Sequence, residues 1–519
     1  MPRGNDKAKI DTEASRREIL AGGSALIGAA MLAGEAQAAS DNSITGMDGL
    51  ALAAAIKNKK VSCVEVMTAY LDHIERINPK VNAIVSLQPR DMLLADAKAK
   101  DEDLVAGRYA GFLHGLPLAP KDLTAAKGIA FTDGSPLFKD RIAQEDSLVV
   151  ARMRAAGGIM IGKTNAPEFG MGSQTYNPVF GTTLNAYDQR LTCGGSSGGA
   201  SVALATRMLA VADGSDNCGS LRNPAGWNNI FGFRTTFGRI PSGGFLFDTS
   251  VTGPMARNVP DLARLLSVQA GPELKEPLSI DEDPGIFAGS LAMNVKGVRI
   301  GWLGDFADAD SKGLAMEPGV LDVCRAALKT FGDMGVGVSE VKVPASAEDA
   351  WQAYTRLRCW ASAANYGALY DDPARRAQLK PEAQWEVEQG RQVTGADVPH
   401  LLAARLHWYQ AFVSLFEAHD FLVAPTAQLF AFDARTHWPA EIAGRKMDTY
   451  LRWMQVCGLI TMTGCPVLAA PAGFDPKGRS MGIQIVGKPR REIDCLKLAN
   501  AYDAATRWPG KRPSPLTKA

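Results

Sequence analysis

The stretch SLVVARMRAAGGIMIGKT, residues 147–164, encodes a helix followed directly by a strand. Its first part, Ser147 to Gly157, has the spacing of an amphipathic helix that ends at a glycine. The apolar residues Gly158 to Ile161 then have the composition of a buried strand. Comparable apolar runs occur at Val298 to Leu303 and at Phe421 to Ala424. Helices that alternate with such short strands predict an α/β fold in which helices cover both faces of a sheet.

The same stretch matches the phosphate-binding pattern G-x-x-x-x-G-K-[ST] at residues 157–164. In a nucleotide-binding loop of this kind a strand enters, glycine-rich backbone wraps the phosphates, and a helix leaves. Here the variable positions have a strand composition, and Asn165-Ala166-Pro167 interrupts any helix that would leave the loop. We therefore give nucleotide binding little weight and look for the chemistry elsewhere.

A further helix is predicted from the capping box Ser62-Cys63-Val64-Glu65, in which serine and glutamate satisfy N–H groups at a helix start. Apolar residues then follow at helical spacing until Asn78-Pro79, where we expect the helix to stop. These residues are Val64, Met67, Leu71, Ile74 and Ile77.

Length and composition favour one large domain. The chain has 519 residues, is 46% hydrophobic, and shows no linker-like segment, charge block or internal repeat. Its 56 Lys and Arg against 55 Asp and Glu leave a net charge of +1, which argues against a surface for nucleic acid or for acidic ligands. None of its 8 cysteines forms a CxxC pair, so neither a zinc site nor a dithiol redox site is indicated. We expect no metal and no cofactor.

The N-terminus, residues 1–38, has the order of an export signal. Basic residues up to Arg16-Arg17 precede the short apolar run AGGSALIGAAMLAG and the small-residue site Ala36-Gln37-Ala38. The arginine pair indicates the twin-arginine route, and cleavage after Ala38 would leave a mature domain of residues 39–519 in the periplasm or outside the cell. The alternative is a frayed amphipathic helix on a cytoplasmic protein. No other stretch is long and apolar enough to span a bilayer.

Three fragments between residues 113 and 241 concentrate the candidate chemistry: 115–122, 193–199 and 216–224. The second contains Gly195-Ser196-Ser197-Gly198-Gly199, which fits the nucleophile elbow G-x-S-x-G of α/β-hydrolases. That elbow needs an apolar strand before it, whereas the polar NAYDQRLTCG precedes it here. The six histidines, at positions 73, 114, 400, 407, 419 and 437, carry no local signature of a base.

Without a histidine, a serine nucleophile can be served by a lysine that burial keeps neutral. Lys121 follows the apolar GLPLAP segment and fits this role, although an ion pair with Asp122 would also account for it. The turn Asn217-Cys218-Gly219-Ser220 has small and polar residues whose successive backbone N–H groups would converge on an oxyanion.

These fragments resemble the amidase signature family, hydrolases that cleave carboxamides with a Ser-Ser-Lys triad. The resemblance extends from about Ile44 to the C-terminus and implies one large domain with a mixed central β-sheet. It would also make the 161–170 segment structural rather than nucleotide-binding. The fragments with family counterparts are GLPLAPKD, IGKTNAPEFG, NAYD, GGSSGG, GSDNCGSLRNPA, APT and GIQIVG.

Carried over by position, the resemblance implies that Lys121 is the base, Ser196 the bridging serine on a cis peptide bond, and Ser220 the acyl nucleophile. The backbone N–H groups of Asn217 to Ser220 would form the oxyanion hole. Ser197 would help to hold Lys121. Asp216 with Arg222 would brace the loop, unless the two form only a surface ion pair.

The chain departs from the family at Cys218, where glycine is common. Because an oxyanion hole uses backbone N–H groups, a small side chain there narrows the pocket without removing the donor. Cys193 and Cys218 flank the site; we expect two buried thiols, with a disulfide as the alternative for an exported protein.

The divergent stretch from about residue 305 to residue 430 should determine the substrate, a small-molecule amide. We favour an apolar, aryl or oligoamide substrate, with esters and carbamates as alternatives. The glutaminase subunit of a tRNA-dependent amidotransferase and a binding protein with an inactive site are further alternatives, and homodimer formation is left open. The aromatic candidates for the pocket are Trp351, Tyr354, Trp360, Trp385, Trp408, Tyr409, Trp438 and Trp453.

Overall fold

The computed structural model describes residues 44–243, 249–307 and 313–518. The predicted export signal, residues 1–38, lies outside these ranges. None of the described helices is long and apolar enough to cross a membrane.

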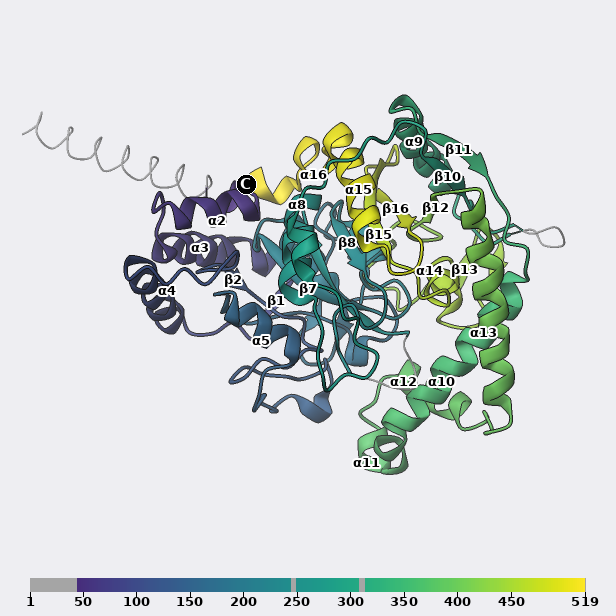
Figure 1. Ribbon diagram of the computed structural model, residues 1–519. Helices are drawn as coiled ribbons and strands as arrows, with labels where there is room; N and C mark the ends of the chain where they lie inside the picture. Colours follow the sequence, from purple (N-terminus) through teal and green to yellow (C-terminus); the bar gives the residue numbers. More distant parts are fainter. Residues whose placement is uncertain (1–43, 244–248, 308–312, 519) are drawn as a thin grey trace, which may run out of the picture.

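A mixed sheet of eight strands forms the centre of the domain (Figure 1), as predicted. In spatial order the strands are β11 (Gly337–Glu340), β10 (Arg299–Trp302), β12 (Phe421–Pro425), β16 (Ser480–Val486), β15 (Val467–Phe474), β8 (Phe231–Arg234), β9 (Val251–Ala256) and β7 (Val211–Asp216). Strand β10 pairs in parallel with both β11 and β12, and the remaining neighbours in the sheet are antiparallel.

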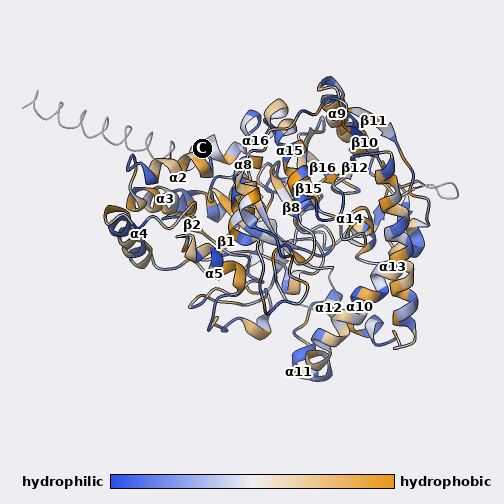
Figure 2. Ribbon diagram, viewed as in Figure 1, coloured by the Kyte–Doolittle hydropathy of each residue, from blue (hydrophilic) through white to orange (hydrophobic). Residues whose placement is uncertain are grey.

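Helices cover both faces of this sheet, so the α/β prediction is confirmed. On one face, α8 (Val259–Gln269), α15 (Glu492–Thr506) and α9 (Val320–Asp333) follow one another across the strands (Figure 1). On the other, α6 (Gly198–Ala205) packs on β7 and β9, and α7 (Asn223–Trp227) packs on β15 and β16. The central strands β15 and β16 are almost entirely buried, and Figure 2 shows their hydrophobic colouring.

A group of helices stands beside the sheet (Figure 1). The long helix α10 (Ala347–Asp371) packs against α12 (Pro381–Gly390), α13 (Asp397–Ser414) and α14 (Gln455–Thr461). Its N-terminus is capped by Ser346, whose side chain accepts a hydrogen bond from the Asp349 N–H. Figure 2 shows hydrophilic and hydrophobic residues mixed along both α10 and α13.

The helix–strand unit at residues 147–164 is present, but it is not a phosphate loop. Helix α5 (Leu148–Ala155) leads to β3 (Ile159–Met160) and then to β4 (Lys163–Thr164). Every residue from 157 to 164 is buried. A Cβ on Gly162 would lie 2.9 Å from the Val85 carbonyl oxygen, so backbone occupies the space that a phosphate would need. Nucleotide binding at this segment is therefore excluded.

The capping box at Ser62 is confirmed, because both of its reciprocal hydrogen bonds are present. The predicted end of this helix is wrong: α3 (Cys63–Val81) runs through Pro79 and ends at Asn82 in the left-handed conformation. Proline removes one hydrogen bond near the end of the helix, and the burial of Ile77 and Val81 offsets that loss.

One close approach fixes α7 on the sheet. Gly226 of α7 lies against Gly482 of β16, and a Cβ on Gly226 would come within 3.0 Å of the Gly482 nitrogen and would also meet Thr426. Since α7 begins three residues after Ser220, this contact sets the depth at which the candidate site sits above the sheet.

Gly226→Ala should therefore destabilise the protein by about 2 kcal/mol, because the added methyl group meets backbone that cannot move aside. Chemical denaturation with a two-state fit measures the loss. Gly332→Ala is the matched control, since Gly332 lies in α9 with no atom within 4 Å of the added Cβ. It should gain up to about 1 kcal/mol from helix propensity. Equal effects of the two substitutions would contradict the close-packing account.

Candidate functional site

A cavity of about 210 Å³ opens above the end of β7. The serines and neighbouring residues that line it come from the segment just before α6, from the end of β7 and from the loop between β7 and α7: Ser196, Ser215, Asn217, Cys218 and Ser220. The structure thus brings two of the three proposed triad residues into one cavity wall, and places the third, Lys121, directly behind it.

Lys121 is fully buried and surrounded by serine hydroxyls. Its Nζ lies 2.6 Å from Ser196 Oγ, 3.0 Å from Ser197 Oγ and 3.0 Å from Ser215 Oγ. The alternative, an ion pair with Asp122, is not formed; that carboxylate accepts hydrogen bonds from Thr132 and Gly134 instead. Ser197 thus contacts Lys121 as expected, and Ser215 is a further contact that the sequence analysis missed.

Burial lowers the pKa of Lys121 from 10.5 to about 7, and the negative charges of Asp213 and Asp216 recover only part of that shift. An amine with this pKa is substantially uncharged at neutral pH, and only the uncharged form can accept a proton. The residue thus has the protonation behaviour that a general base needs.

A backbone hydrogen bond connects the segment that carries Ser196 and Ser197 with the loop that carries Ser220. The Gly195–Ser196 peptide bond is cis, as the family resemblance implies. Ser197 stands at the N-terminus of α6, and its N–H donates to the Ser220 carbonyl oxygen at 3.3 Å. No strand enters Gly195–Gly199 in the described chain, so the nucleophile-elbow interpretation of Ser197 fails for lack of its strand.

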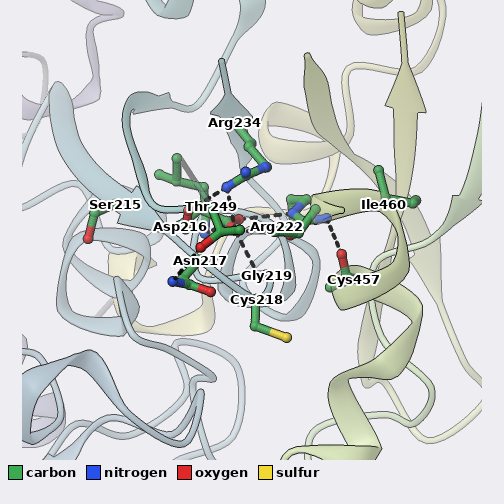
Figure 3. A network of polar contacts seen from close by, with 12 residues as sticks. Ser215, Asp216, Asn217, Cys218, Gly219, Arg222, Arg234, Thr249, Cys457 and Ile460 are labelled. Atoms are coloured by element: carbon green, nitrogen blue, oxygen red, sulfur yellow. Dashed lines mark hydrogen bonds and ion pairs between the residues drawn. The ribbon is translucent and has the colours of Figure 1, made fainter. Parts of the chain in front are cut away.

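A buried ion-pair network supports the loop that carries Ser220 (Figure 3). Arg222 donates from Nε and from a terminal nitrogen to the two Asp216 carboxylate oxygens, at 2.9 and 2.8 Å. Both side chains are fully buried, so the alternative of a surface ion pair is wrong. Burial raises the pKa of Asp216, but Arg222 and Arg234 outweigh it and hold the pKa well below the usual value.

The network continues into the sheet and the neighbouring helix. Arg222 also donates to Gln484 Oε1 of β16 at 2.7 Å, to Thr461 Oγ1 at 2.7 Å and to the Cys457 carbonyl oxygen at 3.0 Å. A bidentate, fully hydrogen-bonded arginine of this kind fixes geometry as well as charge. The loop after β7 is therefore held rigidly against β16 and α14.

Asp216 also accepts a hydrogen bond from one of the backbone N–H groups that were predicted to form the oxyanion hole. The Gly219 N–H donates to Asp216 Oδ1 at 2.8 Å, and the Leu221 N–H donates to Oδ2 at 2.9 Å. Gly219 is therefore engaged in bracing the loop in this structure. Among the described residues, no hydrogen bond engages the N–H groups of Asn217, Cys218 or Ser220, so these three are available to a ligand oxygen.

The cysteines at the site are thiols. All eight cysteines are free and buried, including Cys193 and Cys218, so no disulfide joins that pair. Burial raises the pKa of Cys193 to about 12 and also raises the pKa of Cys218, which keeps both protonated. Figure 3 shows the Cys218 side chain pointing away from the Asp216–Arg222 pair.

One face of α10 lines the opposite wall, and the sequence analysis missed most of it. Of the predicted aromatic candidates, only Tyr354 lies in this wall, and the ring of Tyr366 stacks on Phe169 at 4.4 Å. Hydrophobic periodicity does not detect this face because it mixes polar and apolar residues. The α10 residues that line the cavity are Tyr354, Leu357, Arg358, Ala361, Ser362, Asn365 and Tyr366.

Within the described ranges, no histidine lines the cavity. His73, for example, lies elsewhere with its Nε2 2.7 Å from the Thr206 carbonyl oxygen. In the same ranges, no cluster of three or more His, Cys, Asp or Glu side chains could hold a metal ion. The cavity wall does bring several serine hydroxyls together, with the Lys121 amine behind them.

Comparison with known proteins agrees with this geometry. The model of the Amidase family matches residues 65–496. An acylamidase of Rhodococcus erythropolis is 31% identical over 468 residues, covering 89% of this chain and 96% of the relative. The A subunit of a glutamyl-tRNA(Gln) amidotransferase from Thermosynechococcus vestitus is 32% identical over 479 residues, covering 88% of this chain and 97% of the relative.

Solved structures agree as well. A bacterial aryl acylamidase of the amidase signature family superposes with a TM-score of 0.82 at 26% identity, covering 90% of this chain and 99% of that one. Together with the match of the family model over most of the chain, this shows that the protein belongs to the amidase signature family and is an amide hydrolase.

Proposed function

We propose that the protein is a serine amidase in which Ser220 attacks the amide carbonyl, Ser196 relays the proton and Lys121 accepts it. The observation that supports this most directly is the fully buried Lys121 amine, 2.6 Å from Ser196 Oγ, behind a cavity that Ser196 and Ser220 both line. A buried lysine with serine hydroxyls as neighbours matches the chemistry of an activated nucleophile.

In acylation, Ser220 loses its proton to Ser196 as its oxygen bonds to the carbonyl carbon, and Ser196 passes its own proton to Lys121. The N–H groups of Asn217, Cys218 and Ser220 stabilise the oxygen that becomes negative. The proton then returns to the nitrogen of the breaking C–N bond, and the amine leaves. Water hydrolyses the Ser220 ester by the same route in reverse.

The walls of the cavity support an apolar or aryl substituent on the amide. Leu123, Phe169, Leu357, Tyr366 and Met462 contribute apolar surface beside Ser220. Relatives named acylamidase and aryl acylamidase point in the same direction. Esters and carbamates of similar shape would meet the same nucleophile.

A glutaminase subunit of a tRNA-dependent amidotransferase is the second candidate, because curated relatives with an amidotransferase name are as similar as the acylamidase. Such a protein works inside a larger assembly, whereas a hydrolase acts alone. Turnover of an anilide by the purified chain without partners would favour the hydrolase; activity that appears only with the other amidotransferase components would favour the glutaminase.

We also propose that the protein is exported, on the basis of the basic, apolar and small-residue order of residues 1–38. The pair Arg16-Arg17 ahead of the apolar run supports the twin-arginine route in particular. The mature enzyme would then act in the periplasm or outside the cell.

Ser220→Ala should leave the fold intact and reduce amide turnover by several orders of magnitude, because no other group would form the acyl-enzyme. Labelling with a phosphonyl fluoride, followed by peptide mass spectrometry, locates the nucleophile. Modification at Ser197, with Ser220 unmodified, would contradict the assignment.

For Lys121, kcat/KM should rise with pH through about 7 to an alkaline plateau, because the lowered pKa leaves the amine charged below that value and neutral above it. Lys121→Arg should be as inactive as Lys121→Ala, since arginine does not deprotonate. Lys121→Ala should lose anilide cleavage more severely than cleavage of the matched ester, whose alkoxide needs the returned proton less. Substantial amidase activity in Lys121→Arg would show that the lysine serves only as a charge.

Replacement of both Arg16 and Arg17 by lysine should trap unprocessed precursor in the cytoplasm, because the twin-arginine route requires the arginine pair. Immunoblots of cytoplasmic and periplasmic fractions measure the distribution. Processing of the double variant at the wild-type level would argue against this route.

A further inference from the structure

The catalytic cavity contains one charged side chain that the proposed mechanism does not use. Among the described residues that line the cavity, Arg358 is the only lysine, arginine, histidine, aspartate or glutamate. It lies on the α10 wall, in the same stripe as Tyr354 and Ser362. Burial of a charged side chain costs free energy unless the charge is paired, so we looked for the partner of this arginine and for a role in substrate binding.

Its partner is Glu386, on the neighbouring helix α12. Arg358 Nε donates to Glu386 Oε1 at 2.8 Å, and the carboxylate is fully buried. Ser362 and Tyr450 also donate to Glu386, so both oxygens of the buried acid accept hydrogen bonds. Although burial lowers the pKa of Arg358, the charge of Glu386 outweighs it, and the arginine stays charged. The pair is therefore electrically neutral.

Arg358 also connects to the oxyanion side of the cavity. One of its terminal nitrogens lies 3.5 Å from Tyr354 Oη, and Tyr354 donates to Asn217 Oδ1 at 2.7 Å. The guanidinium is thus held by Nε on one side and by a tyrosine on the other. Such a fixed fork is suited to donate N–H groups to an oxygen in the cavity.

We propose that Arg358 is a specificity-determining residue that donates hydrogen bonds to a second, neutral carbonyl oxygen of the substrate. The substrate class is then an amide that carries another carbonyl group, as in a diamide or an oligoamide. This inference rests on the proposed function, because it takes Ser220 as the point of attack on the first carbonyl.

The charge balance favours a neutral oxygen over a carboxylate. Glu386 already neutralises Arg358, so a substrate carboxylate would bring an uncompensated negative charge into a partly buried cavity. A neutral carbonyl oxygen accepts the same hydrogen bonds without that cost. Removal of the Glu386 charge should therefore move the preference toward a carboxylate.

The test uses matched anilides whose acyl chains have equal length and end in a carboxamide, an isopropyl group or a carboxylate. A second set carries the same three ends on the amine side, because the cavity contacts do not assign Arg358 to one side of the scissile bond. Wild type should prefer the carboxamide in one of the sets. The double variant Arg358→Met, Glu386→Gln removes both charges of the pair and so avoids a buried, unpaired acid.

In the double variant, kcat/KM for the carboxamide should fall about 10- to 100-fold more than for the isopropyl substrate, as expected for lost hydrogen bonds from a charged donor. Glu386→Gln alone should favour the carboxylate over the carboxamide. Arg391→Met is the control: Arg391 makes an exposed ion pair, to Asp371 at 2.6 Å, outside this cavity. It should not alter the preference among the three ends.

Equal losses for all three ends in both sets, or a wild-type preference for the carboxylate, would overturn the inference. A carboxamide preference that persists in Glu386→Gln would show that charge balance does not set it. Ser220→Ala, assayed beside these variants, separates the two proposals. If it is inactive while the double variant loses activity equally toward all three ends, only the specificity inference fails; if it retains turnover, the proposed function fails.

Discussion

The amine of Lys121 can be uncharged at neutral pH only if water is excluded from it, and the residues around Lys121 are arranged to exclude water. The residue is fully buried, and serine hydroxyls rather than carboxylates contact its nitrogen. Asp213 and Asp216 lie close enough to raise its pKa, yet burial still lowers the value to about 7. The Asp216 carboxylate is engaged elsewhere, through its ion pair with Arg222.

The same ion pair connects the chemistry to the fold. Asp216 ends β7, and its carboxylate holds both Arg222 and the N–H groups of Gly219 and Leu221. Arg222 in turn contacts Gln484 of β16, in the middle of the sheet. We therefore expect a change in the sheet, for example at the contact of Gly226 with Gly482, to move the Ser220 loop.

Local patterns predicted the α/β class, the Ser62 capping box and the three candidate fragments, because helix caps, short apolar runs and glycine-rich turns are encoded over a few residues. They did not predict that α3 continues past Pro79, since the compensation comes from tertiary burial. They also missed Ser215 and Arg358. Ser215 lies in a strand without a motif, and Arg358 belongs to a mixed polar stripe of α10 whose role appears only when the helix packs over the cavity.

The proposed mechanism requires that the amine of Lys121 be neutral in the folded enzyme near neutral pH. A direct test is a carbon-13 NMR titration of the protein labelled at lysine Cε, with Lys121→Met to identify the Lys121 signal. We expect this signal to titrate with a midpoint near 7, about where burial places its pKa. A midpoint near the ordinary value of 10.5 would contradict the mechanism, because the residue would then be charged when the enzyme is expected to act.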